Sequence, residues 1–328
     1  MLWRQRLRQH VQRKADRAVP LSRRHFIAAT VCAGALPLPA RASGESHTLL
    51  GCITGNDPAG YLRFARFLGR KPDLALLAFN QTKADALWSS VAYICQHGAQ
   101  FADEGARILW SVPCPGARQL EAIVAGDWDE PYAKLFNAIL AVSPADDSGI
   151  LLRLPWEFNL ASQENAAIDK NGDFNAGLFV QAFQRLAALA WRVSPRFLRI
   201  WCPNVCTMQL DPVLCWPGAD YADVIAQDFY LQKAYNKPGD FEWFLNENRG
   251  LRWGAEFARR NGCPYGLPEW GMDSDSFAGD FNAAALWLKG LGPRLDHHCW
   301  WDRSEVADCR ISDGTNPALA AAYRQQWG

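Results

Sequence analysis

The sequence predicts a (β/α)8 TIM barrel, built as a single domain over residues 43–328. Eight short apolar runs alternate with longer helical stretches from residue 48 to the end of the chain. The runs are nearly continuous in apolar residues, as expected for parallel strands that are buried on both faces. No linker, low-complexity tract or long charge run divides this region, and 49% of the 328 residues are apolar, enough for a large core.

The expected elements follow one another regularly along the chain. The strand-like runs are Leu49–Thr54, Asp73–Phe79, Arg107–Val112, Gly149–Glu157, Phe197–Asn204, Asp223–Tyr230, Pro264–Trp270 and His297–Trp301. The expected helices cover 58–69, 82–98, 117–124, 130–142, 176–192, 240–260, 281–290 and Pro317–Trp327. An open doubly wound sheet is the competing architecture, but it should carry a G-x-G-x-x-G turn after its first strand. The first strand here ends in Thr54-Gly55-Asn56-Asp57-Pro58, which favours the barrel.

Residues 1–42 resemble a twin-arginine export signal. A basic leader precedes Ser22-Arg23-Arg24-His25-Phe26, the apolar run Ile27–Leu38 follows, and Ala40-Arg41-Ala42 offers an A-x-A-like cleavage site. A membrane anchor or a basic tail is the alternative, but the apolar run is too short to span ~30 Å of hydrocarbon as a helix. We therefore expect a periplasmic or secreted protein with no stable membrane insertion after signal cleavage.

Charge and cysteine content exclude several classes of partner and site. Residues 43–328 hold 25 basic and 33 acidic residues, so this acidic body predicts no nucleic-acid partner. Nine cysteines follow Cys32, and Cys202, Cys206 and Cys215 are close enough in sequence for one disulfide. No C-x-x-C pair occurs, and the oxygen-rich stretch 169–175 fails the EF-hand pattern. The sequence thus predicts no metal and no cofactor.

Acidic and phenolic side chains end three of the expected strands. Glu157 ends the fourth run, Glu269 lies near the end of the seventh, and Tyr230 ends the sixth between them. Catalytic groups of a parallel barrel come from these strand ends. Two carboxyl groups are what glycoside cleavage needs, one to protonate the leaving oxygen and one to attack the sugar or activate water. The structural alternative for Glu157 is an ion pair with Arg153, which alternation along one strand would place on the same face.

Three segments give the sequence a resemblance to a known family. The segments R-L-P-W-E-F-N at 153–159, W-P-G-A-D-Y-A-D-V-I-A-Q-D-F-Y at 216–230 and P-E-W-G at 268–271 resemble glycoside hydrolase family 26. That family belongs to a clan of retaining (β/α)8 glycosidases and includes β-mannanases. The resemblance implies that Glu157 is the acid/base, Glu269 the nucleophile, and Tyr230 the donor that hydrogen-bonds the nucleophile.

The candidate substrate-binding residues combine polar groups at strand ends with aromatic platforms. They are Arg153, Trp156, Asn159, Asn204, Trp216, Asp228, Trp270, Trp300 and Trp301, and the resemblance makes one of the last two the floor under the sugar. Two positions depart from the family pattern. Trp156 stands where the family usually has His, and Leu160 stands where a Gly usually follows the Asn.

Together these features predict an exported, retaining, mannanase-like endo-β-glycanase that cleaves a polysaccharide by double displacement. Burial against aromatic rings and the nearby Glu269 should both raise the pKa of Glu157, while Tyr230 should help Glu269 to stay ionised. The alternative is a catalytically inactive glycan-binding barrel that serves exopolysaccharide assembly. A barrel enzyme of another reaction class, such as a lyase, is a third reading.

Overall fold

The computed structural model describes residues 47–328, apart from 80–83, 115–118, 146–148, 164–166, 169, 170 and 306 and the side chains of 84–86. The predicted export signal at 1–42 lies outside the described residues. So do Asp169 and Lys170 of the oxygen-rich stretch.

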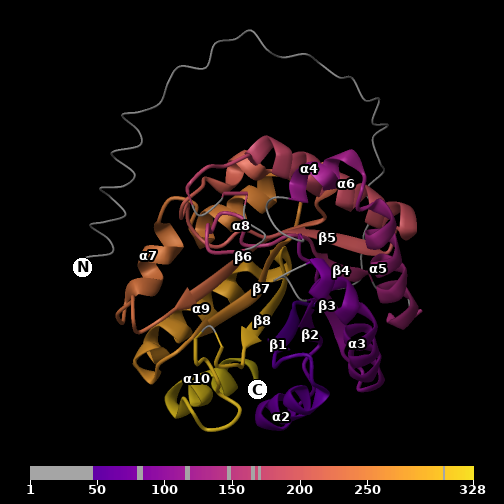
Figure 1. The fold of residues 1–328 in the computed structure, drawn as a ribbon. Helices are drawn as coiled ribbons and strands as arrows, with labels where there is room; N and C mark the ends of the chain where they lie inside the picture. The colour runs from indigo at the N-terminus through magenta and orange to yellow at the C-terminus, as the bar shows by residue number, and fades with distance from the viewer. Residues whose placement is uncertain are drawn as a thin grey trace, which may run out of the picture. The chain divides into compact units, whose positions relative to one another are not determined.

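Eight parallel strands close into a barrel in sequence order, which confirms the predicted fold class (Figure 1). The strands are β1 (Leu49–Ile53), β2 (Leu74–Ala78), β3 (Arg107–Ser111), β4 (Ile150–Arg153), β5 (Phe197–Trp201), β6 (Val224–Leu231), β7 (Tyr265–Met272) and β8 (Leu295–Trp301). β1 pairs with β8 over five residues, from Leu49 opposite His297 to Ile53 opposite Trp301. This pairing closes the ring.

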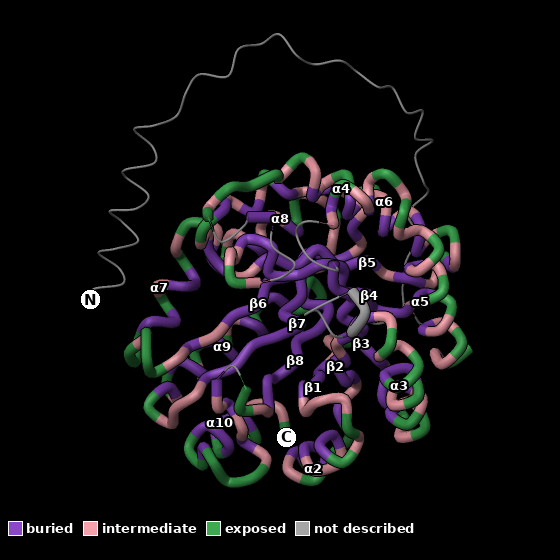
Figure 2. The backbone as a smooth tube through the Cα atoms, in the orientation of Figure 1, coloured by how far each residue is buried: buried purple, intermediate pink, exposed green. Residues whose placement is uncertain are grey.

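Helices surround the barrel, and Figure 2 shows that the buried backbone concentrates in the strands and on the inner sides of the helices. The helices are α2 (Pro58–Leu68), α3 (Ala84–Asp103), α4 (Leu120–Ala125), α5 (Asp129–Val142), α6 (Ala176–Val193), α7 (Asp240–Asn246), α8 (Leu251–Arg260), α9 (Ala278–Leu291) and α10 (Pro317–Trp327). Local sequence fixes their ends. The side chain of Asp57 accepts from the Ala59 N–H to cap α2, Pro58 begins the helix, and Gly69 ends it at φ 83°.

The expected single helix over 240–260 is in fact two helices, so that prediction is wrong. Arg249 has a positive φ of 59°, which interrupts the helical backbone. A side chain at Gly250 would place its Cβ 2.3 Å from the carbonyl oxygen of Phe244, so only glycine fits this close approach. The chain turns here and begins α8.

The connection from β5 to β6 contains no α-helix, only the short 3-10 turns η2 (Pro212–Cys215) and η3 (Ala219–Tyr221). Aromatic side chains cover the barrel at this place instead. Trp201 of β5 meets Trp216 edge-on at 5.2 Å, and Trp216 packs in the same way against Phe257 of α8. The family-like W-P-G-A-D run thus belongs to the barrel wall.

Cys202, Cys206 and Cys215 are free thiols, so the disulfide that their spacing allowed does not form. The thiol of Cys202 donates to the side chain of Asp228 inside the barrel at 3.2 Å. Cys215 lies on the other side of the strand, where its carbonyl accepts from the Trp201 indole. None of the helices in the described part of the chain combines the length and apolarity needed to cross a membrane.

Candidate active site

Glu157 lies four residues beyond the end of β4, in a left-handed backbone conformation. Its φ is 49°, and such a conformation in a non-glycine residue costs about 1–3 kcal/mol and occurs most often at functional sites. Its N–H donates to the carbonyl of Cys202 at 2.8 Å, which fixes the bend against the end of β5. The predicted strand as far as Glu157 is therefore wrong, and this bend, not strand alternation, sets the direction of the carboxyl group.

The carboxyl group of Glu157 is buried and held by two amide donors. The side chain of Asn204 donates to Oε1 at 2.7 Å, and that of Gln163 donates to Oε2 at 2.5 Å. Burial and the charge of Glu269 raise the pKa of Glu157, the two amide hydrogen bonds and the charge of Arg153 oppose them, and the net result is a pKa of about 7. The predicted direction is confirmed. At neutral pH this group is present in both protonation states, as a general acid/base requires.

Two side chains donate hydrogen bonds to opposite carboxyl oxygens of Glu269. The hydroxyl of Tyr230 donates to Oε1 at 2.7 Å, and the guanidinium of Arg153 donates to Oε2 at 3.0 Å. The predicted hydrogen bond from Tyr230 is present, whereas the roles of nucleophile and acid/base stay predictions.

The side chain of Arg153 is buried and bonds to several residues of this site, so substrate cannot reach it. Its guanidinium donates to both carboxylate oxygens of Asp228 at 2.9 and 2.8 Å, to Glu269, and through Nε to the hydroxyl of Ser111 at 2.9 Å. Only 1% of the residue is exposed, which contradicts the prediction that it binds substrate. The ion-pair alternative is also wrong in its partner, because Arg153 pairs with Asp228 and Glu269, not with Glu157.

Asp228 is fully buried between Arg153 and Cys202, so it too has no face toward a substrate. Burial raises the pKa of Asp228 above its usual range, and the paired guanidinium opposes that shift. The predicted substrate contact of Asp228 is replaced by a structural one. It fixes Arg153, which in turn fixes Glu269.

Asn159 positions Asn204, and Asn204 positions Glu157. The side chain of Asn159 is buried, accepts from the Asn204 N–H at 2.8 Å and donates to the Asn204 carbonyl at 2.9 Å. Asn159 is therefore saturated by backbone groups, contrary to its prediction as a substrate contact. Asn204 is partly exposed and bonds Glu157, so it stays a candidate for substrate contact.

Trp156 and Trp301 each contact a residue that bonds Glu269. The guanidinium of Arg153 lies 4.6 Å from the ring centroid of Trp156, and Trp301 meets the ring of Tyr230 edge-on at 6.1 Å. Both keep a small exposed fraction, 6% and 9%. Trp301 rather than Trp300 is therefore the candidate sugar floor.

The other predicted platforms are packed away from the site. Trp270 stacks on Phe281 of α9 at 5.6 Å, Trp300 meets the same ring edge-on, and both tryptophans are fully buried. Trp216 lies in the barrel wall against Trp201 and Phe257. Burial of Trp270 and Trp300 contradicts their predicted substrate contact, whereas Trp216 is partly exposed and its contact with substrate stays a prediction.

Two residues of the site were missed by the sequence analysis. Gln163 donates a hydrogen bond to Glu157. Ser111, the last residue of β3, accepts a hydrogen bond from Arg153. Ser111 belongs to the strand-end set and was open to the same reasoning as the glutamates. Gln163 lies in a polar loop with no distinguishing pattern. Within the described ranges, no group of three or more His, Cys, Asp or Glu side chains is placed to bind a metal ion.

Comparison with known proteins finds no matching family model and no matching curated protein. Solved structures do match. The YdhT protein of Bacillus subtilis superposes with a TM-score of 0.60 at 16% identity, over 88% of each chain. A mannanase from Bacillus subtilis gives 0.58 at 15% identity, also over 88% of each chain.

A modular endo-β-1,4-mannanase from Cellulomonas fimi, described as a family 26 glycoside hydrolase, gives a TM-score of 0.62 at 15% identity. The match covers 85% of this chain and 70% of that one. Identities this low carry information on the fold alone. The chain therefore has the (β/α)8 fold of the family 26 mannanases, as its three resembling segments implied.

Proposed function

We propose that this protein is an exported, retaining glycoside hydrolase that cleaves a polysaccharide. The proposal depends on one observation above all, which is the different surroundings of two carboxyl groups. Burial and the neighbouring charge raise the pKa of Glu157 to about 7, whereas Tyr230 and Arg153 donate to the two carboxyl oxygens of Glu269. Glycoside hydrolysis by double displacement needs one protonated and one ionised carboxyl group in this way.

In the first step, the carboxylate of Glu269 attacks the anomeric carbon while Glu157 gives its proton to the leaving oxygen. The ester that forms on Glu269 carries no charge. The repulsion between the two carboxylates that helps to raise the pKa of Glu157 is therefore lost. Glu157 then accepts a proton from water as that water attacks the glycosyl ester. Glu269 leaves as a carboxylate, which returns both groups to their starting states.

The proposed substrate class is a β-mannan or a related β-glycan. Endo-β-1,4-mannanases are among the solved structures that share the fold. Trp301, beside Tyr230 and Glu269, offers a flat face for a sugar ring at the point of attack. Trp156 stands over Arg153 where the family usually has His, so we expect a change in substrate preference and no loss of the chemistry.

The decisive experiment compares Glu157→Gln and Glu269→Gln with Glu242→Gln, an exposed position on α7, on mannan and on an aryl β-mannoside with a good leaving group. Loss of Glu269 should abolish hydrolysis of both substrates. Loss of Glu157 should abolish mannan hydrolysis but spare formation of the glycosyl ester from the aryl substrate, with added azide restoring turnover. Proton NMR of the first product should show retained anomeric configuration. Saturable mannan binding by the unaltered protein with no new reducing ends would instead establish a glycan-binding barrel.

Export is the second part of the proposal, and the pair Arg23-Arg24 supports it. Replacing both arginines with lysine keeps the charge but removes the twin-arginine signal. We expect the double variant to accumulate in the cytoplasm with its leader attached, whereas the natural chain is cleaved near Ala42. Equal export of both chains would reject the twin-arginine route and leave the proposed hydrolysis untouched.

A further inference from the structure

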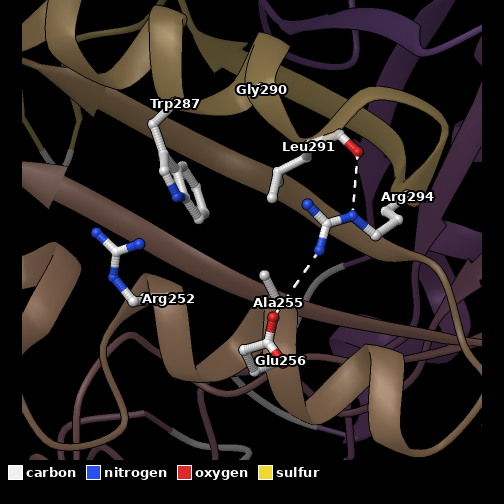
Figure 3. Close-up of a pocket in the computed structure, with 7 residues that line it drawn as sticks. All are labelled: Arg252, Ala255, Glu256, Trp287, Gly290, Leu291 and Arg294. Carbon is white, nitrogen blue, oxygen red and sulfur yellow. Dashed lines mark hydrogen bonds and ion pairs between the residues drawn. The ribbon is translucent and has the colours of Figure 1, made fainter.

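A pocket lies on the outside of the barrel, between the two helices that precede and follow β7, α8 and α9. Its volume is about 240 Å³, below the ~300 Å³ at which sites for drug-sized ligands begin. The lining residues are Arg252, Ala255, Glu256, Trp287, Gly290, Leu291 and Arg294 (Figure 3). A space of this size suits one sugar ring.

Two guanidinium groups border this pocket from opposite sides, as Figure 3 shows for Arg252 and Arg294. Each is oriented by one neighbour. Nε of Arg252 donates to the side chain of Asn246 at 3.0 Å, and Nε of Arg294 donates to the Leu291 carbonyl at 3.2 Å. Among the described residues, no carboxylate pairs with Arg252, so its terminal nitrogens are available to a ligand.

The one carboxylate in the lining, that of Glu256, offsets one of these two positive charges. Glu256 bonds Arg259 on its own helix at 2.9 Å and reaches Arg294 only at 3.8 Å. With Arg252 and Arg294 against Glu256, the lining therefore carries an excess of one positive charge, although the body of the protein is acidic. Local excess charge of this kind attracts an anion.

Trp287 adds a flat wall to the same pocket. It is partly exposed, and Figure 3 shows it on the side of Arg252. Its inner edge is fixed against Tyr265 of β7, with ring centroids 6.1 Å apart. Gly290 leaves open space beside it, since a Cβ there would meet nothing within 4 Å. An aromatic face beside guanidinium forks suits a sugar ring that bears a carboxylate.

We propose that the α8–α9 pocket is an accessory binding site for a hexuronate residue of an acidic polysaccharide. An extended anion such as nucleic acid would need a long basic surface, and the acidic body offers none. The site lies outside the proposed hydrolytic centre and does not depend on its chemistry. It gives the protein a second binding site for a glycan that carries both neutral and acidic sugars.

The test is calorimetric titration of the full chain with tetragalacturonate, using mannotetraose as the neutral comparison. All proteins carry Glu269→Gln, so hydrolysis plays no part and failure of the proposed catalysis leaves the result unaffected. We expect Arg252→Gln to weaken tetragalacturonate binding at least tenfold. Arg260→Gln, an exposed position at the end of α8 outside the pocket, should change it less than twofold.

Two further variants separate this site from general surface charge. Glu256→Gln should tighten tetragalacturonate binding, because it removes the only carboxylate of the lining. If the substitution only disturbed the structure of the pocket, binding would weaken instead. Gly290→Leu should block binding while adding a good helix former to α9. Equal weakening by Arg252→Gln and Arg260→Gln, equal binding of mannotetraose at the pocket, or absence of tetragalacturonate binding to the parent chain would each overturn the proposal.

Discussion

The hydroxyl of Tyr230 donates to Oε1 of Glu269 at 2.7 Å, while Arg153 occupies the other oxygen of the same carboxylate. The nucleophile proposed here is therefore clamped on both oxygens before any substrate arrives. Tyr230 is neutral and partly exposed, whereas Arg153 is charged and fully buried. Removal of Tyr230 should therefore affect mainly the activity, and removal of Arg153 should also lower the free energy of unfolding.

Tyr230→Phe should lower kcat/KM by roughly 10- to 100-fold, because one hydrogen bond to a charged group is worth about 1.5–3 kcal/mol. The free energy of unfolding should change much less, since the aromatic ring stays in place against Trp301. Steady-state kinetics on mannan and urea unfolding measure the two effects. Tyr235→Phe serves as the control, because the Tyr235 side chain is 69% exposed. An unchanged kcat/KM for Tyr230→Phe would remove Tyr230 from the reaction.

Activity should decline as the pH rises through about 7, because the first step needs Glu157 in its protonated form. Gln163→Ala removes a hydrogen bond that lowers the pKa of Glu157, so this basic limb should move to higher pH. The pH dependence of kcat/KM reports this directly. Gln181→Ala, on the exposed face of α6, should leave the profile in place. A basic limb that is identical in all three proteins would contradict the assignment of Glu157 as the acid.

The same pKa makes a prediction about stability. A carboxyl group whose pKa rises from 4.5 to about 7 on folding stabilises the folded chain relatively more at low pH. That contribution is lost as the pH rises from about 4.5 through 7, when the buried Glu157 must ionise. Glu157→Gln should therefore gain stability relative to the natural chain between pH 5 and pH 8, by up to a few kcal/mol. Thermal unfolding of both proteins across this range measures the difference, and a gap that stays constant with pH would refute the shifted pKa.

Arg153→Met should cost about 3–5 kcal/mol of unfolding free energy, because it leaves Asp228 and Glu269 buried without their counter-charge. Arg185→Met is the matched comparison. Arg185 also makes a two-pronged ion pair, with Asp129, but both side chains are about one-third exposed. Its loss should cost at most about 1 kcal/mol. Chemical denaturation measures the free energy of unfolding of both variants. Equal losses in the two would contradict the structural role of the buried Arg153 ion pairs.

The architecture was predictable because each strand is an apolar run in the sequence. Such runs are typical of parallel strands that are buried on both faces, so the number and order of the strands could be identified. The limits of the elements were less predictable. β4 ends at Arg153, and the strand-like character of the next residues reflects their burial in a loop. The break between α7 and α8 depends on the positive φ at Arg249 and the close approach at Gly250, and this glycine was the one local signal of the break.

The site divides in the same way. Glu157, Glu269 and Tyr230 were found because carboxyl and hydroxyl groups at strand ends are costly unless they are used or paired. The misplacement of Trp270 was avoidable, since it follows Glu269 in a strand and so must face the helices when Glu269 faces the barrel mouth. The resemblance already implied a supporting role for Asp228, but the demotion of Arg153 and Asn159 to such roles was not foreseeable. It depends on which partners meet across four different strands and their loops.

The shared guanidinium of Arg153 also constrains how this protein can change over evolutionary time. A single side chain couples the packing of the barrel interior to the placement of the proposed nucleophile. A lineage that abandons catalysis can discard Tyr230 or Glu157 at small structural cost, yet it must retain Arg153, or replace it together with both of its acidic partners. Relatives that have become pure binding proteins should therefore be recognised by an intact Arg153–Asp228 pair beneath a dismantled reaction centre.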